Sequence, residues 1–115
     1  MSKIKIKYFG PIKDNDGWID IKKVTVFIGD QGSGKSTVAK LISIFSWIEK
    51  VLTRGDYEEK WFTRGKKFRN ELCTYHGIEN YFISDKSGEI TYIAYQGDAY
   101  YIEYREGQLS IKENG

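Results

Sequence analysis

Apolar and charged residues alternate at the start of the chain. Over residues 3–8 each lysine is followed by an isoleucine or a tyrosine, and a period of two predicts a strand with one exposed face. The Gly10-Pro11 pair and the Asp-Asn-Asp-Gly segment at 14–17 then indicate two turns. Residues 18–21 (WIDI) predict a short strand that returns against the first one.

The period changes in the next stretch. Residues 24–28 (VTVFI) are almost continuously apolar, which is typical of a strand covered on both faces. From Lys35 the apolar residues recur at helical spacing, and Gly55 is placed to end the helix. The apolar positions are Val38, Leu41, Ile42, Phe45, Ile48 and Leu52, with Ile44, Trp47 and Val51 widening the arc. We therefore expect a largely buried helix.

The second half has a different pattern. Phe68, Leu72 and Tyr75 form one helical stripe that Gly77 is placed to end, while residues 78–84 fit a short helix or a strand equally well. Strands rich in Tyr and Ile follow, separated by turns at Gly88, Gly97 and Gly107. This alternation predicts an antiparallel meander.

Composition limits the class of protein. The 115 residues suffice for one domain, 40% of them are hydrophobic, and the net charge is +2. A single cysteine, Cys73, excludes an internal disulfide, and no apolar run approaches the length of a membrane span. The start of the chain lacks the apolar centre of a signal peptide. We expect a cytoplasmic protein.

The predicted fold class is α/β with α+β character. Residues 1–115 form one nucleotide-binding lobe, with strands, loop and helix in 1–55 and a helix and meander in 56–115. The lobe combines a mixed sheet and a buried helix with the antiparallel meander.

The glycine-rich loop between the apolar strand and the helix carries the strongest chemical signal. Residues 29–36 (GDQGSGKS) match G-x-x-x-x-G-K-[ST] without a gap. Glycines let the backbone wrap a polyphosphate closely, and the following helix adds its free N–H groups and positive dipole end. Lys35 can follow the β- and γ-phosphates, and Ser36 can place its hydroxyl on Mg²⁺.

The sequence thus predicts a site for ATP or ADP with Mg²⁺, and Ser36 is the expected metal ligand. The predicted nucleotide-binding residues are Gly29, Asp30, Gln31, Gly32, Ser33, Gly34, Lys35, Ser36 and Thr37. Thr37 is expected to contact the α-phosphate less decisively.

The stretch from Ile4 to Ile44 resembles the N-terminal lobe of ABC-type ATPases, especially the SMC-like and RecF-like ones, and so an AAA-family ATPase domain. The resemblance rests on IKIKYFGPIK, WIDI and VTVFIGDQGSGKSTVAKLI; Asp30-Gln31 stand where Pro-Asn is usual. It implies an ATPase, and an ATP-dependent homodimer is an expected assembly. It also implies that the adenine lies near the first strands, with Tyr8, Lys13 and Trp18 as candidate contacts.

Other motifs of these ATPases are missing. No four apolar residues precede an Asp-Glu pair, and residues 107–110 only share letters with the signature motif. Gln96 invites comparison with their Mg²⁺-contacting glutamine, but a turn residue is favoured. We therefore expect the chain to be a piece of a longer ATPase, hydrolysing ATP only when a downstream lobe completes it, with no catalytic residue of its own.

Two alternatives remain open. A small P-loop kinase or GTPase is disfavoured, because the chain lacks N/T-K-x-D and an Arg-rich lid. The second alternative is an interaction or nucleic-acid-binding module in which the nucleotide has a structural role. Its candidates are a basic segment, Lys60, Arg64, Lys66, Lys67 and Arg69 with Trp61, Phe62 and Phe68, and the tyrosines Tyr92, Tyr95, Tyr100, Tyr101 and Tyr104. A solvated helix face and ordinary strand packing are favoured for these two sets. Cys73 and His76 lack a second pair for a metal site.

Overall fold

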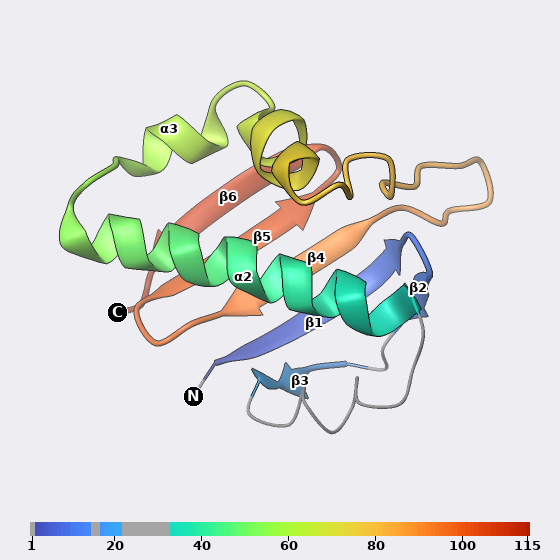
Figure 1. The fold of residues 1–115 in the computed structure, drawn as a ribbon, viewed down its shortest axis with the longest axis horizontal. Coiled ribbons are helices and arrows are strands. Elements are labelled where there is room, and N and C mark those ends of the chain that lie inside the picture. Colours follow the sequence, from blue (N-terminus) through green and yellow to red (C-terminus); the bar gives the residue numbers. More distant parts are fainter. Residues whose placement is uncertain (1, 15–16, 22–32) are drawn as a thin grey trace.

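One antiparallel sheet forms the centre of the molecule (Figure 1). The computed structural model describes residues 2–14, 17–21 and 33–115, with the backbone alone at 14 and 33–35. The strand order is β2-β1-β4-β5-β6, and β3 pairs with the other end of β1. The strands are β1 (Lys3–Phe9), β2 (Ile12–Asp14), β3 (Ile19–Asp20), β4 (Tyr92–Gln96), β5 (Tyr100–Arg105) and β6 (Gln108–Glu113).

The predicted return strand and the predicted meander are both confirmed. β3 runs antiparallel to β1, and β4, β5 and β6 pair in succession. Every strand pair in the described part of the chain is antiparallel. The strand expected over 24–28, and with it the mixed character of the sheet, lies outside the described residues.

The end of β1 departs from simple alternation. Tyr8 adopts a φ of 52°, a left-handed conformation that is uncommon outside glycine. The irregularity moves Phe9 onto the buried face that Ile4 and Ile6 occupy. Gly10 then turns the chain into β2 with a φ of 55°, and a side chain there would collide with the Tyr81 ring. Only glycine fits both the backbone and the space at this position.

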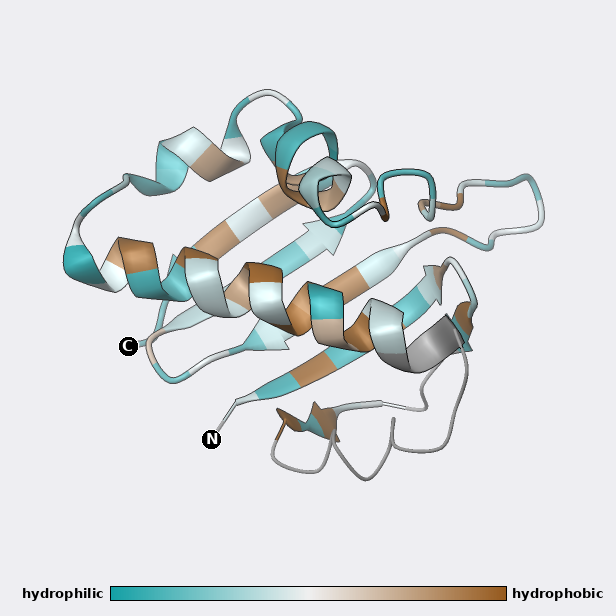
Figure 2. Cartoon of the chain, viewed as in Figure 1, coloured by the Kyte–Doolittle hydropathy of each residue, from teal (hydrophilic) through white to brown (hydrophobic). Residues whose placement is uncertain are grey.

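The long helix α2 (Ser33–Arg54) lies across one face of the sheet (Figure 1). Apolar residues recur along it (Figure 2), and its buried positions follow the predicted stripe. Trp47 is 38% exposed and Ile42 is half-buried, so one face of the helix is buried and the other meets solvent. The helix ends as predicted, because the Gly55 N–H donates to the Leu52 carbonyl and the Asp56 N–H to the Val51 carbonyl.

Two shorter helices follow α2. They are α3 (Glu59–Thr63) and the π-helix η2 (Phe68–Cys73), and Gly77 ends the second as predicted. The predicted stripe is wrong at Tyr75, which is 85% exposed, although Phe68 is buried. The reason is the π-helix, whose i→i+5 hydrogen bonds place more residues in each turn and rotate later positions away from the core.

Residues 78–84 form neither a helix nor a full strand. Phe82 bridges to Phe9 and Ser84 to Ile90 as isolated pairs. Thr91, which is 4% exposed, fixes this segment, because its hydroxyl donates to the Tyr8 carbonyl and accepts the Ile83 N–H at 2.7 Å. A buried hydroxyl bonded on both sides joins the segment to the end of β1.

Candidate nucleotide-binding site

The predicted phosphate loop leads into the first turn of α2. The helix begins at Ser33, so the backbone of Lys35 and Ser36 belongs to its first turn, while residues 29–32 lie outside the described residues. The first four N–H groups of a helix have no acceptor within it. No acidic residue occupies the first turn, so no side chain of that turn offsets the positive end of the dipole. Ser36 is exposed, whereas Thr37 is 1% exposed.

Aromatic stacking fixes α2 against the sheet. The Phe45 ring lies 5.4 Å from the Tyr95 ring of β4 and 5.4 Å from the Phe68 ring of η2, nearly parallel to both. Leu41, Phe45 and Ile48 are fully buried beside them. Each such side chain stabilises the docked helix by about 1.5–3 kcal/mol relative to an exposed position. The middle of α2 is thus packed firmly against the sheet and η2.

A carboxylate fixes the other end of α2. Glu49 accepts hydrogen bonds from the Tyr95 hydroxyl at 3.0 Å, the Ala99 N–H at 2.7 Å and the Tyr100 N–H at 2.9 Å. Gly97 leaves room for this carboxylate, because a side chain there would occupy the same space. Sequence reasoning missed Glu49, whose polar neighbours along the exposed face give no signal for a bonded carboxylate.

These contacts place Gln96 away from the start of α2. Gln96 adjoins Gly97 at the turn that Glu49 holds, and its amide donates to the Gly97 carbonyl and to Asn114 Oδ1. Glu49 lies thirteen residues after Ser36, about 20 Å along a helix. Gln96 is the last residue of β4, paired with Lys3 and Tyr101, so the favoured interpretation as a turn residue is off by one position.

The candidate adenine contacts divide into two groups. Tyr8 lies level with Lys13 of β2, because Lys7 pairs with Asp14 and Phe9 with Ile12. Lys13 is exposed. Trp18 precedes β3 at the opposite end of β1, where the Lys3 ammonium lies 5.1 Å from its ring. Ile4, which pairs with Ile19, lies about 13 Å from Tyr8 along the strand. The structure thus distributes the three candidates along β1 and does not gather them at one point of it.

The basic segment uses several of its cations and rings within the fold. Phe62 and Phe68 are buried, so neither ring is free to stack on a base. The Lys67 ammonium lies 4.2 Å from the Trp61 ring, and the Arg69 guanidinium lies 4.7 Å from the Phe82 ring. This geometry favours a solvated face with internal cation–π contacts over a nucleic-acid surface.

The tyrosines of the meander lie on both faces of the sheet. Tyr95, Tyr100 and Tyr104 are buried on the α2 side. Tyr92 and Tyr101 lie on the other face, where both hydroxyls donate to Glu103, at 2.7 and 3.1 Å. Burial and these bonds raise the pKa of Tyr101, so it stays protonated at neutral pH. Three of the five tyrosines serve the core, as expected for a half-buried pleated surface.

The structure favours a core role for Cys73. Cys73 is fully buried, and desolvation raises its pKa to about 12. No three potential metal ligands of these types cluster among the described residues.

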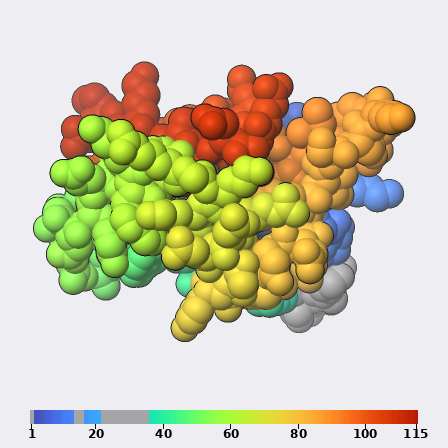
Figure 3. Space-filling view, turned by 90° about the horizontal axis from the view of Figure 1, so that it is seen from above, coloured from blue at the N-terminus to red at the C-terminus, as the bar shows by residue number. Residues whose placement is uncertain are grey.

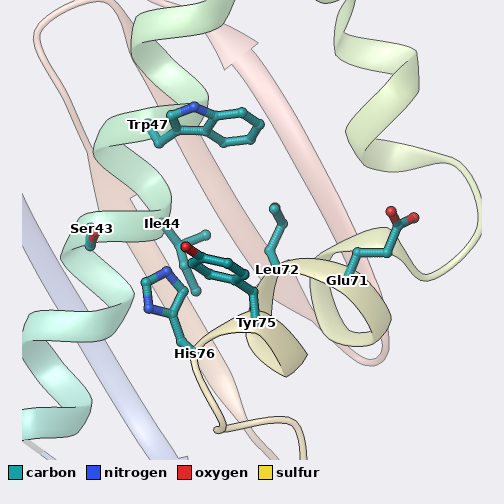
Figure 4. Close-up of a pocket in the computed structure, with 7 residues that line it drawn as sticks. All are labelled: Ser43, Ile44, Trp47, Glu71, Leu72, Tyr75 and His76. Carbon is teal, nitrogen blue, oxygen red and sulfur yellow. The ribbon is translucent and has the colours of Figure 1, made fainter.

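A hollow of about 460 Å³ separates α2 from the end of η2 (Figure 4). Ser43, Ile44 and Trp47 line it from α2, and Tyr75 and His76 point toward it from the opposite side. Burial lowers the pKa of His76, with the Lys40 charge adding to the effect. The hollow is mainly apolar and lies beside the middle of α2, away from its first turn.

The antiparallel sheet and the long helix that begins within the G-x-x-x-x-G-K-[ST] motif are the features expected of a nucleotide-binding protein. The chain belongs to the AAA ATPase domain family, whose pattern matches residues 1–96. Membership implies the P-loop nucleotide-binding fold and ATP binding, with Mg²⁺ as the expected companion ion. No curated protein and no solved structure matches the chain. No helix in the described ranges is long and apolar enough to cross a bilayer.

Proposed function

We propose that this chain is the Mg-ATP-binding lobe of an ABC-type ATPase of the SMC-like or RecF-like kind. The observation that carries the proposal is the continuity of motif and helix, because GDQGSGKS runs directly into α2. The family match over residues 1–96 supports nucleotide binding. Within this proposal, residues 29–34 surround the phosphates with backbone N–H groups, Lys35 neutralises phosphate charge, and Ser36 binds Mg²⁺.

Hydrolysis in this proposal requires more than the residues of this lobe. Phosphoryl transfer depends on orienting the attacking water and stabilising charge on the γ-phosphate. The sequence has no Asp-Glu pair after an apolar strand to orient that water. A downstream lobe with that pair and the signature motif, acting in an ATP-dependent homodimer, would supply these groups.

A comparison of binding with turnover tests this proposal. We expect the 115-residue chain to bind ATP and ADP in the presence of Mg²⁺, to bind AMP much more weakly, and to release phosphate no faster than background. Lys35→Ala controls for a contaminating ATPase. Robust turnover that depends on Lys35 would contradict the proposed lobe and favour a complete small NTPase.

The second candidate function is nucleic-acid binding, and the sheet face opposite α2 is the observation that favours it. Lys3, Lys5 and Lys7 alternate with buried residues along β1. Register places Lys3, Gln96, Tyr101 and Lys112 in one row and Lys5, Ala94, Glu103 and Ser110 in the next. Trp18 is 40% exposed beside Lys3 and Tyr101. Asp20, opposite Lys3, and Glu103 oppose part of this charge.

Charge reversal distinguishes this face from the basic segment. If single-stranded nucleic acid binds the face, Lys5→Glu with Lys112→Glu should weaken binding of a fluorescent oligo(dT) and flatten its salt dependence. Lys66→Glu with Lys67→Glu is the matched control and should leave the affinity unchanged. The reverse result would assign binding to the basic segment, and no binding by the unmodified chain would eliminate this second function.

A further inference from the structure

A second hollow, of about 380 Å³, lies where η2, residues 82–91 and the β5–β6 turn meet. Figure 3 shows these segments, in yellow, orange and red, together on one face of the molecule. Its lining includes Arg69, Phe82, Ser84, Ile90, Tyr104 and Gly107. The volume is within the range of small-molecule sites. None of these residues belongs to the phosphate loop.

Arg69 is held in place at this hollow. Its Nε donates to the Glu79 carbonyl at 3.1 Å, and its guanidinium lies 4.7 Å from the centre of the Phe82 ring. No carboxylate of the described residues pairs with it. The two terminal nitrogens of the guanidinium therefore remain for a ligand, and their planar arrangement matches a carboxylate or a phosphate.

Tyr104 adds a hydroxyl donor to the same hollow. Its ring packs 5.0 Å from Phe82 and 5.4 Å from Phe68, and only 8% of the residue is exposed. Burial raises the pKa of Tyr104 while Arg69 lowers it, with burial the larger effect. The group is therefore a neutral O–H donor at physiological pH. Ser84, an exposed residue of the segment that bridges to Ile90, also lines the hollow.

The hollow also has apolar lining, and two cations and one carboxylate line it and its neighbour. Phe82, Ile83 and Ile90 provide apolar surface, and Ile90 is 39% exposed. A smaller hollow of about 80 Å³ adjoins it, sharing Arg69 and Tyr104, and Lys66 lines that side. Glu106 is the only carboxylate that lines either hollow.

We propose that this hollow binds a small aromatic oxyanion, a planar apolar molecule that carries a carboxylate or a phosphate. The Arg69 guanidinium and the hydroxyls of Tyr104 and Ser84 bind the anionic group. Phe82, Ile83 and Ile90 contact the ring. None of the residues that line this hollow is among the predicted nucleotide-binding residues 29–37.

Amide NMR titration of the ¹⁵N-labelled chain tests the proposal. Benzoate and phenyl phosphate are the two anionic probes, and benzyl alcohol is the neutral control. We expect benzoate, phenyl phosphate or both to bind with a Kd of about 1 mM, as is typical for ligands of this size. The shifts should centre on the amides of Ser84 and Gly107 and on the Arg69 Nε–H. Stronger binding of one probe identifies the preferred oxyanion.

Variants then separate the anion site from a general apolar hollow. Arg69→Ala should weaken probe binding at least tenfold and Arg69→Lys less, because lysine keeps the charge without the fork. Arg64→Ala, an exposed arginine outside both hollows, and Lys35→Ala should leave it unchanged. If Arg69→Ala does not fold, Arg69→Lys and Ser84→Ala provide the measurement. Equal binding of benzyl alcohol, shifts elsewhere, or an unchanged Kd in the Arg69 variants would overturn the proposal.

Discussion

His76 shows how one side chain makes stability depend on pH. It is half-buried at the hollow beside α2, with its ring 5.2 Å from that of Tyr75. Burial lowers its pKa below 6.5, and the Lys40 charge acts in the same direction. The unfolded chain therefore binds more protons than the folded one as the pH falls through 6.5. The contribution of His76 is fully present above that pH and is lost below it.

We expect His76→Gln to reduce the loss of stability on mild acidification. Urea unfolding of both proteins at several pH values on either side of 6.5 measures this effect. The free energy of unfolding of the unmodified chain should fall more steeply below 6.5 than that of the variant. An NMR titration that gives His76 a pKa at or above 6.5 would contradict the proposed cause.

At the scale of single residues, the sequence predicts which side chains are buried better than it predicts backbone conformations. The alternation in residues 3–8 predicted which side of β1 is apolar, but not the left-handed backbone at Tyr8. That conformation depends on Thr91, which bonds the Tyr8 carbonyl from 83 residues further along the chain. Helical spacing placed Tyr75 in a buried stripe, and the π-helix before it moved Tyr75 into solvent.

At the scale of elements, Glu49 joins α2 to the turn between β4 and β5. Three donors converge on its carboxylate, two of them backbone N–H groups of the turn. Removing the carboxylate leaves these part-buried donors without a partner, which costs more than the loss of an exposed ion pair. The same turn holds Gly97, whose missing side chain makes room for the carboxylate.

We expect Glu49→Ala to lower the free energy of unfolding by about 3 kcal/mol. Glu49→Gln should cost less, because its amide oxygen keeps one acceptor. Lys50→Ala, at the exposed neighbouring position, is the control and should change stability by no more than about 0.5 kcal/mol. Denaturant unfolding measures all three variants, and equal effects of Glu49→Ala and Lys50→Ala would show that the carboxylate does not fasten the turn.

The long periodic elements are the ones that the sequence predicted. α2 and the meander contain enough residues for their periods to be unambiguous, and the hydrogen bonds confirm the glycine signal at Gly55 that ends α2. They also confirm the signal at Gly77 that ends the helical segment containing η2. The segment 78–84 is too short for its apolar residues to show a clear period, so its structure depends on tertiary contacts such as the bridge from Phe82 to Phe9. The role of Glu49 also depends on such contacts, because its partners lie about fifty residues away.

For the whole molecule, the described structure packs α2 against the sheet, and the proposed nucleotide site lies at the start of that helix. The candidate site stays a prediction from eight consecutive residues, which the sequence can supply because phosphate binding by a loop is a local property of the backbone. The sequence could not predict how the candidate adenine contacts are distributed, because this depends on which end of β1 each short strand joins. The hollow at Arg69 also required the structure, because distant segments form it.

Titration calorimetry of the chain with Mg-ATP tests the central claim, that the loop before α2 binds the phosphates of a nucleotide. Removing a charge that pairs with phosphate costs about 2–5 kcal/mol. We therefore predict that Lys35→Ala weakens binding by about two orders of magnitude or more. Lys40→Ala, a lysine of the same helix beyond the motif, should bind as the unmodified chain does. Equal affinity of the unmodified chain and Lys35→Ala for Mg-ATP would contradict the assignment.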